Sequence, residues 1–326
     1  MSVTPVLDVR SSSEFRQGHM PGAVSFPLFT DDERAHIGTI YKNIGKNKAV
    51  LEGLRIVGPK LAHFVEQANS LSPDQCVSMY CWRGGMRSGS MAWLLRTAGF
   101  SVDLMKGGYK AYRQKVQQSF CADIPFVILS GPTGSGKTEI LSELRKLGEQ
   151  VLDLEQLACH RGSAFGALGM AQQPTIEQFE NEVYQALQAM DFSRRIWVED
   201  ESRKIGKVVL HSGLWENLNR APLVLLDSPL EDRVQRLVEE YGAFGSDVLS
   251  ESLQKIGKRL GGLSLRDALA ALETGDLVQV AEISLKYYDK AYRFSREKRN
   301  RNVADMVETK GLAANEVAQL LCKQKI

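Results

Sequence analysis

The chain has 326 residues, more than a single domain usually contains, so two domains are expected. Its hydrophobic content of 43% and charged content of 25% are those of a globular protein, and a net charge of +2 gives no global signal for a nucleic-acid partner. The absence of a leader-like N-terminus and of any apolar run of about 18 residues predicts a cytoplasmic protein without a membrane partner. Five scattered cysteines with no CxxC pair argue against a disulfide framework or a zinc site.

The first part of the chain alternates short apolar runs with helical stretches. The runs are PVLDV, AVSFP, CVSMYC and VDLMKGG, and residues 58–71, GPKLAHFVEQANSL, are a clear helical stretch. This alternation is typical of a parallel α/β sheet with helices on both faces. The pattern closes within QQSFCADIPF, so we place a boundary near residue 120 and expect a first domain over residues 1–120.

A second α/β pattern opens at FVILSG and continues to the end of the chain. FVILSG, QVLDL, RIWVED and PLVLLDSP read as buried strands with amphipathic segments between them, and residues 230–292 read as helix-rich. We therefore expect a second doubly wound domain over residues 121–326, with a helical C-terminal region.

Residues 131–138, GPTGSGKT, match the phosphate-loop pattern G-x-x-x-x-G-K-[ST] between a predicted strand and a predicted helix. The loop glycines allow successive backbone N–H groups to face an anion, and the lysine adds a mobile positive charge. The threonine would ordinarily hold Mg²⁺ together with a carboxylate at the end of RIWVED. The candidate diphosphate-binding residues here are Gly131, Gly134, Ser135, Gly136, Lys137, Thr138, Glu199 and Asp200.

Two further loops supply candidate diphosphate contacts. CHRGSAFG contains His160 and Arg161 just beyond a predicted strand, where ligand-facing loops of open α/β sheets collect. EDESRKIG places Arg203 directly after the two carboxylates. On residue types alone, CHRGSAFG is equally consistent with an ordinary polar loop.

The stretch MYCWRGGMRSGS, residues 79–90, sets Cys81 between a predicted strand and a predicted helix. Loop N–H groups, the helix N-terminus and Arg87 would lower the thiol pKa and bind an oxyanion beside it. Cys81 and Arg87 are therefore the candidate catalytic pair. The loop residues Arg83, Gly84, Gly85, Met86 and Arg87 are the candidate anion cradle. The alternative is a buried core thiol, which would suit Cys76 better than Cys81.

Together these segments resemble a known combination of domains. LDVRSSSEFRQGHMPGAVSFPLF resembles the opening of a rhodanese domain, and YCWRGGMRS resembles its active-site loop. A rhodanese domain joined to a phosphate-loop domain resembles the tRNA 2-selenouridine synthase family. GTIYKNIGKNKA, DLEQLACHRGSAFG, WVEDESRKIG and SPLEDRV also resemble that family, so the similarity covers nearly the whole chain.

The cysteine loop departs from the commonest rhodanese form, because five residues rather than four separate Cys81 from Arg87. Rhodanese-related phosphatases also use this wider spacing, which suits an anion of phosphate size. Their usual histidine before the cysteine is replaced here by Tyr80. We therefore rank a phosphatase below chalcogen transfer.

The family resemblance implies that selenium replaces sulfur at C2 of a wobble 2-thiouridine in tRNA, with selenophosphate as the donor. It also implies a geranylated intermediate made from geranyl diphosphate. The Cys81 loop would suit selenophosphate and the phosphate loop would suit the geranyl donor, with no tightly bound cofactor and Mg²⁺ possible at Thr138. Cys81 could carry selenium as a perselenide, or attack the pyrimidine C2 and help to expel the thiol.

Residues 286–301, KYYDKAYRFSREKRNR, carry seven basic residues and several interleaved aromatics. Lys286, Lys290, Arg293 and Arg296 are the candidate tRNA contacts on this helix. A solvated charged helix with its aromatics facing the core is equally consistent with the pattern. Two other functions stay open at this stage: a rhodanese-type sulfurtransferase or phosphatase fused to an ATP-dependent small-molecule kinase, and a nucleotide-gated binding module.

Overall fold

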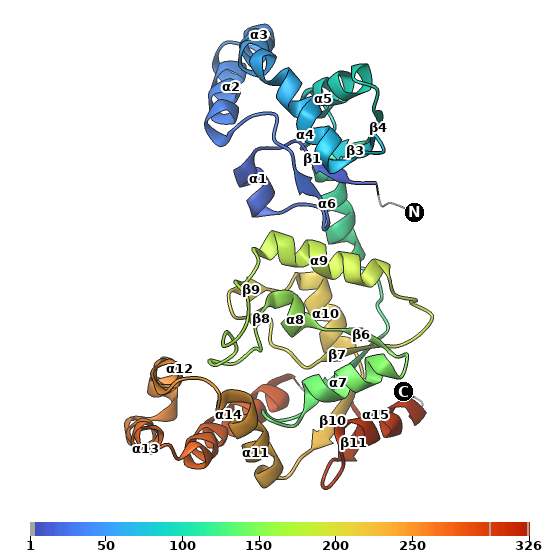
Figure 1. Ribbon diagram of the computed structural model, residues 1–326. Coiled ribbons are helices and arrows are strands. Elements are labelled where there is room, and N and C mark those ends of the chain that lie inside the picture. Colours follow the sequence, from blue (N-terminus) through green and yellow to red (C-terminus); the bar gives the residue numbers. More distant parts are fainter. Residues whose placement is uncertain (1–3, 300, 325) are drawn as a thin grey trace. The chain divides into compact units, whose positions relative to one another are not determined.

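Two parallel sheets organise the chain in the computed structural model, which describes residues 4–299, 301–324 and 326 (Figure 1). The chain divides by internal contacts into two units. The first comprises the described residues up to Ser119 together with Glu180–Glu182, and the second comprises the remainder. Each unit is built around one of the two sheets.

The sheet of the first unit has four parallel strands in the order β2-β1-β3-β4. The strands are β1 (Val6–Asp8), β2 (Val24–Ser25), β3 (Cys76–Tyr80) and β4 (Ser101–Leu104). The helices are α1 (Ser12–Gln17), α2 (Asp31–Asn43), α3 (Lys46–Val57), the short η1 (Gly58–Lys60), α4 (Leu61–Leu71), α5 (Met86–Thr97) and α6 (Gly108–Ser119).

The alternation of side chains along β3 explains why helices cover both faces of this sheet. Met79 packs with Phe64 of α4 and Leu95 of α5 in the larger apolar core. Its neighbour Tyr80 points to the opposite face, where it packs with Tyr109 of α6. The predicted parallel sheet with helices on both faces is therefore confirmed.

The sheet of the second unit has five parallel strands in the order β11-β10-β5-β7-β6. The strands are β5 (Phe126–Ser130), β6 (Gln150–Leu152), β7 (Ile196–Glu199), β10 (Leu223–Asp227) and β11 (Val303–Glu308), and β8 (Lys204–Ile205) with β9 (Val208–Val209) forms a separate antiparallel pair. The helices are α7 (Lys137–Lys146), α8 (Leu154–Ala158), α9 (Ile176–Gln188), α10 (Ser212–Arg220), α11 (Leu230–Tyr241), α12 (Ser246–Leu260), α13 (Gly262–Glu273), α14 (Leu277–Arg299) and α15 (Ala314–Lys323).

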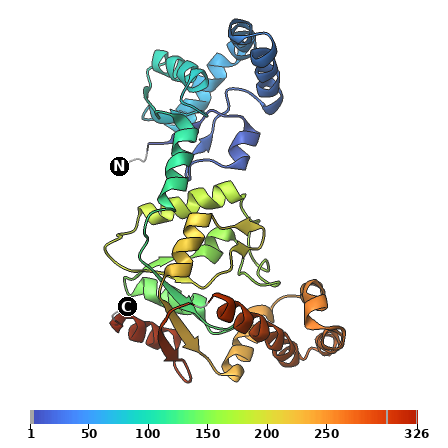
Figure 2. The same cartoon turned by 180° about the vertical axis from the view of Figure 1, so that it is seen from behind.

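Helices cover this sheet as well. α7 and α15 pack on one face, where Leu144 and Leu321 join the apolar core, and α10 lies against β5 on the other face, as Figure 2 shows from behind. Helices α11, α12, α13 and α14 contact one another in a separate helical group that follows β10. Among the described residues, even the 23-residue α14 is too polar to cross a membrane.

Strand β11 was missed by sequence reasoning. It is an edge strand, and Val303 and Met306 are exposed while Val307 is buried against the sheet. A single inward apolar residue next to a strongly basic helix gives almost no alternation signal.

Candidate functional site

Cys81 lies at the end of β3, directly before the loop that leads into α5. Its side chain is buried, and the residue is 3% exposed. The Gly85 N–H and the Ser88 hydroxyl both donate hydrogen bonds to its Sγ atom, over 3.3 and 3.2 Å. The loop is closed by Gly108, where an added Cβ would lie 2.2 Å from the Cys81 carbonyl oxygen and where φ is +57°. Only glycine fits that position.

These contacts set the protonation state of the thiol. Burial raises the pKa of Cys81, but the hydrogen bonds from the Ser88 hydroxyl and from the N–H groups of Ser88, Arg83 and Gly85 outweigh it, so the pKa is lowered overall. The N-terminus of α5, which begins at Met86, favours the anion further. Cys81 is thus both a core residue and a thiol with a lowered pKa, whereas Cys76 is exposed, contrary to the expectation that Cys76 is the buried thiol.

The largest contributions to the lowered pKa of Cys81 come from Ser88, Arg83 and Gly85 and not from Arg87, contrary to the sequence-based expectation. The Arg87 guanidinium donates to both carboxylate oxygens of Glu14, over 2.5 and 3.2 Å. Burial raises the pKa of Glu14, yet the ion pair with Arg87 brings it below the ordinary value. Glu14 therefore fixes Arg87 at the rim of the loop. Sequence reasoning gave no role to Ser88, although it directly follows Arg87 in the first turn of the helix.

Arg83, Gly84 and Met86 also lie at this loop, and all three are exposed. Gly84 has φ of +65°, and an added Cβ would lie 2.9 Å from the Met105 carbonyl oxygen. The predicted cradle residues are therefore brought together around Cys81, with Arg87 bound to Glu14.

Replacing Ser88 by alanine should raise the pKa of Cys81, because the thiolate loses a charge-assisted hydrogen bond. We expect alkylation of Cys81 by iodoacetamide at neutral pH to slow by a factor of about 3 to 10. Its pH profile should move toward alkaline values. Ser90→Ala removes an exposed serine of the same helix, and it should leave the profile unchanged. An unshifted profile for Ser88→Ala would contradict this account of the thiolate.

The phosphate loop follows β5 and leads into α7, as expected from the sequence. Gly134 and Gly136 have φ of +79° and +78°, and a Cβ on Gly134 would lie 2.9 Å from the Arg233 carbonyl oxygen. The Lys137 ammonium donates to the Gly131 carbonyl oxygen over 3.0 Å. The loop forms one wall of an open cleft of about 540 Å³, a size typical of ligand sites. The predicted residues Gly131, Gly134, Ser135, Gly136, Lys137 and Thr138 all line this cleft.

Arginines from distant segments line the same cleft. Arg236 of α11 donates to the Gly134 carbonyl oxygen over 3.0 Å, and so supports the loop from outside. Arg161 also lines the cleft, as predicted, and pairs with Glu240 over 3.1 Å. Sequence reasoning missed Arg236 because its segment, EDRVQRLVEEY, reads as an ordinary charged helix. The arginines that line the cleft are Arg161, Arg236, Arg296, Arg299 and Arg301.

Neither carboxylate at the end of β7 is placed to hold Mg²⁺ together with Thr138, as the sequence suggested that one of them would be. Asp200 accepts from Arg299 and Arg301 over 2.9 and 2.5 Å, and from the Ser130 hydroxyl over 2.6 Å. Glu199 is buried and does not line the cleft; burial and the neighbouring acidic groups raise its pKa well above the ordinary value. Asp200 is neutralised by arginines, so it does not fit a Mg²⁺ site shared with Thr138.

Glu155 and Glu201 form a carboxyl pair in the cleft near Lys137. Burial raises the pKa of both groups, the charge of Glu155 raises that of Glu201 further, and Lys137 opposes both shifts only in part. With their pKa values raised, these carboxyls hold a proton more readily than an ordinary glutamate does.

His160 and Arg203 do not reach the phosphate-loop cleft. The His160 Nδ1 atom accepts from the Gly162 N–H over 3.1 Å, and burial lowers the pKa of the ring. This geometry gives His160 a role in shaping its own turn. Arg203 is exposed and precedes the β8–β9 pair. Neither residue is among those lining the cleft.

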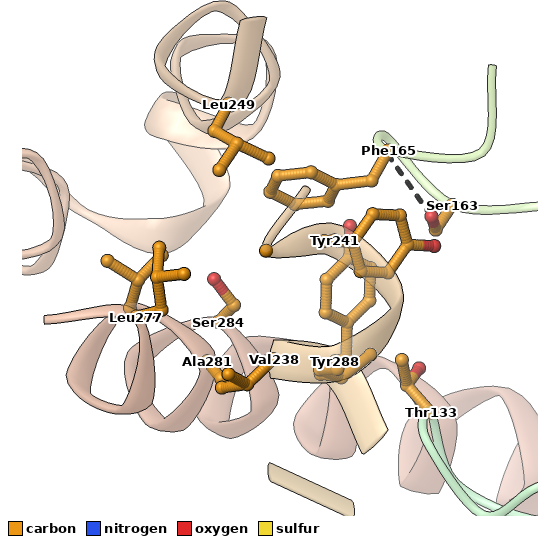
Figure 3. Close-up of a pocket in the computed structure, with 13 residues that line it drawn as sticks. Thr133, Ser163, Phe165, Val238, Tyr241, Leu249, Leu277, Ala281, Ser284 and Tyr288 are labelled. Carbon is orange, nitrogen blue, oxygen red and sulfur yellow. Dashed lines mark hydrogen bonds between the residues drawn. The ribbon is translucent and has the colours of Figure 1, made fainter. Parts of the chain in front are cut away.

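A small apolar pocket adjoins the cleft at Thr133 of the phosphate loop (Figure 3). Phe165, Leu249 and Leu277 point into it from separate elements, and Tyr241 and Tyr288 lie between it and the cleft. Its volume is about 60 Å³, several times the space that one water molecule requires. It therefore has room for a small apolar group.

The basic segment belongs to α14, where Lys286, Lys290 and Arg293 are exposed and Arg296 reaches the edge of the cleft. The tyrosines of this helix are turned inward. The Tyr292 hydroxyl lies 2.9 Å from that of Ser130, and the Tyr288 hydroxyl accepts from the Ala164 N–H over 3.3 Å. Phe294, in contrast, is 68% exposed.

Two family models match this chain, one over the part that contains the Cys81 loop and one over the part that contains the phosphate loop. Residues 2–115 match the family model of the rhodanese-like domain, and residues 124–324 match the model described as the tRNA 2-selenouridine synthase AAA domain. The protein is thus an enzyme in which a rhodanese-like thiol loop is joined to a phosphate-loop domain. It belongs to the tRNA 2-selenouridine synthase family.

Curated relatives match over most of their length. The tRNA 2-selenouridine synthase of Shewanella denitrificans (strain OS217) is 32% identical and covers 93% of this chain and 91% of its own. That of Bdellovibrio bacteriovorus (strain HD100) is 34% identical and covers 91% and 90%. Among solved structures, the N-terminal domain of an ATP/GTP binding protein from Clostridium difficile 630 is 41% identical, covers 35% of this chain and 88% of that one, and has a TM-score of 0.34.

Proposed function

We propose that this enzyme replaces sulfur by selenium at C2 of the wobble 2-thiouridine of tRNA in two steps, one at each loop. The phosphate loop would hold geranyl diphosphate, and the Cys81 loop would hold selenophosphate. The observation that carries the proposal is the pairing of a thiol whose pKa is lowered with a separate cleft, which is lined by the phosphate loop and by arginines and adjoins an apolar pocket.

In the first step, the 2-thio sulfur attacks C1 of geranyl diphosphate. The C1–O bond breaks, the S–C1 bond forms, and pyrophosphate leaves with the electron pair. Lys137, Arg161 and Arg236 lie where they would neutralise the charge of this leaving group. The pocket beside Thr133 would receive an apolar part of the chain, which favours a prenyl diphosphate over a nucleotide.

Alkylation of sulfur also releases the N3 proton of the base. Glu155 and Glu201 line the same cleft as the phosphate loop and have raised pKa values, so they are our candidates to accept this proton. Because the carboxylate form must accept the proton, the rate of geranylation should rise with pH through the raised pKa of this pair. A rate that falls over that range would contradict its role as the base.

In the second step, Cys81 attacks C2 and expels geranylthiolate, forming a C2–Sγ bond. The selenium of selenophosphate then attacks C2, Cys81 leaves as thiolate, and water cleaves the Se–P bond to release phosphate. This order is balanced without any oxidant or reductant. Transfer of selenium from selenophosphate to Cys81 as a perselenide would instead require phosphorus to leave in a reduced form. We therefore favour attack on C2.

Reversing the charge of the basic stripe on α14 tests the proposed tRNA contact. Lys290→Glu with Arg293→Glu should weaken tRNA affinity by about tenfold or more at low salt, and should flatten its dependence on salt concentration. Both side chains are exposed, so folding should be unaffected. Filter binding across a salt series measures both quantities. Unchanged affinity and salt slope would remove this contact.

Nucleoside mass analysis tests the function as a whole. The purified enzyme, thiolated tRNA, geranyl diphosphate and selenophosphate should yield 2-selenouridine, and omission of selenophosphate should leave geranylated 2-thiouridine. Consumption of ATP in step with turnover would contradict the assignment of the phosphate loop. Release of phosphate from an aryl phosphate through Cys81 without tRNA would point to a phosphatase.

A further inference from the structure

An apolar groove lies beside Cys81 within the first unit. A small anion such as selenophosphate would not need an apolar groove for its binding. Helices α2 and α3 form one wall, and the loop from Cys81 to Arg87 forms the other. Its volume is about 560 Å³. The larger apolar side chains that line it include Phe29, Ile37, Tyr41, Leu54, Trp82 and Met86.

Several of these side chains face solvent. Tyr41 is 58% exposed, Leu54 is 63% exposed and Met86 is 52% exposed. Isolated exposed apolar residues are ordinary, but a contiguous set that lines one groove marks a binding surface. The set ends at the Cys81 thiol, so its occupant must carry apolar groups close to the atom that Cys81 attacks.

The groove is also lined by cations. Arg34 of α2 lies in one wall of the groove, and Arg83 and Arg87 of the cysteine loop lie in the other. Arg34 lies 3.6 Å from Glu14, at the same carboxylate that holds Arg87. A ligand that fits this surface combines a hydrocarbon part with negative charge, as an alkylated nucleotide does.

We propose that this groove binds the hydrocarbon chain of the S-alkylated 2-thiouridine, and so orients C2 toward Cys81. The inference rests on the proposed function, because the alkylated base is its intermediate. C1 of the chain is two bonds from C2, so when Sγ approaches C2 the chain must begin within a few ångströms of the thiolate. The groove begins there, since Cys81 itself is part of its lining.

This assignment gives each step an apolar pocket of its own. The pocket beside Thr133 would receive the chain of the diphosphate donor, and the groove beside Cys81 would receive the same chain once it is attached to sulfur. Each buried methylene strengthens binding by a factor of about 4. The groove would therefore select alkylated tRNA over unmodified 2-thiouridine tRNA and set the order of the steps.

Gly38 is the position at which this groove can be filled without disturbing the fold. It lies within α2, lines the groove and is exposed. An added Cβ would meet only the flexible end of Arg34, at 3.7 Å. Gly38→Leu should therefore fold, since leucine also favours helix more than glycine does. Ala35→Leu is the matched control, because Ala35 is exposed on the same helix but does not line the groove.

The test measures binding of two anticodon stem-loop RNAs to the full chain, one bearing S-geranyl-2-thiouridine and the other S-methyl-2-thiouridine. We expect the unmodified protein to bind the geranyl RNA about tenfold or more tightly than the methyl RNA. Gly38→Leu should remove most of that preference without changing affinity for the methyl RNA, and Ala35→Leu should keep the preference. Equal affinities in the unmodified protein, or a preference unaffected by Gly38→Leu, would overturn the proposal.

Two further outcomes separate this inference from the function on which it rests. If geranylated tRNA is converted to 2-selenouridine but chain length has no effect on binding, the groove assignment fails and the function stands. If the chain preference and its loss in Gly38→Leu are found without conversion, the groove assignment stands and the proposed reaction fails. If Gly38→Leu instead changes the molar mass of the protein in solution, the groove contacts a second copy and the proposal is overturned.

Discussion

Replacing Cys81 by serine should abolish formation of 2-selenouridine, with a loss of at least about 10³-fold in rate. A serine hydroxyl stays protonated at neutral pH, so the hydrogen bonds that stabilise the Cys81 thiolate would surround a poor nucleophile. The two side chains are similar in size, and the apolar core around position 81 should remain packed. In the complete reaction, nucleoside mass analysis should show geranylated 2-thiouridine accumulating in place of the selenium product.

Accumulation of geranylated 2-thiouridine would show that Cys81→Ser has lost only the selenation step and that the variant is still folded and active in geranylation. Geranylation belongs to the second unit in our proposal, so it should proceed at the unmodified rate in Cys81→Ser. Cys76→Ser is the matched control, because Cys76 begins the strand β3 that leads to the loop but is exposed. Full selenation by Cys81→Ser would eliminate every role proposed for this thiol.

Replacing Lys137 by alanine should have the opposite effect. The ammonium group lines the cleft and folds back on the Gly131 carbonyl oxygen, from which it would turn to a bound diphosphate. Loss of this charge should slow geranylation by about 10²- to 10³-fold, because the leaving pyrophosphate loses its most mobile countercharge. The measurement is the initial rate of geranyl-2-thiouridine formation from thiolated tRNA and geranyl diphosphate.

Supplying the intermediate should rescue this variant. When tRNA that already carries S-geranyl-2-thiouridine is given with selenophosphate, Lys137→Ala should produce 2-selenouridine at the unmodified rate. Lys146→Ala is the control, since Lys146 lies on the same helix but pairs with Glu143 at the surface. A variant that loses selenation of the prepared intermediate would show that the two steps do not divide between the loops.

The two loops were predictable because each is a continuous segment whose function depends on local backbone geometry. GPTGSGKT and CWRGGMR require glycines at fixed offsets between a strand and a helix, and such spacing is visible in any sequence. The parallel sheets were predictable for a similar reason, since buried strands leave continuous apolar runs. Strand β11 was not, because only Val307 is buried along it.

The partners of the charged groups were not predictable, since they are separated widely along the chain. Arg87 bonds to Glu14, 73 positions away, so the expected electrostatic support for Cys81 comes instead from Ser88 and the loop N–H groups. The Asp200 carboxylate is neutralised by Arg299 and Arg301, whereas a metal ligand needs a free negative charge. His160 and Arg203 lie outside the phosphate-loop cleft, which their position after a strand did not predict.

By itself the sequence determined the family, the order of the two domains and the two loops, because these are properties of consecutive residues and their spacing. Tertiary structure alone decided which charges are neutralised, which tyrosines of α14 face the cleft, and that an apolar pocket or groove lies beside each loop. Those properties depend on side chains from several elements that meet only after the helices pack on the sheets. The spacing of residues along the sequence does not show which side chains from different elements come into contact. The cavities that would receive the hydrocarbon chain are therefore visible only in the folded structure.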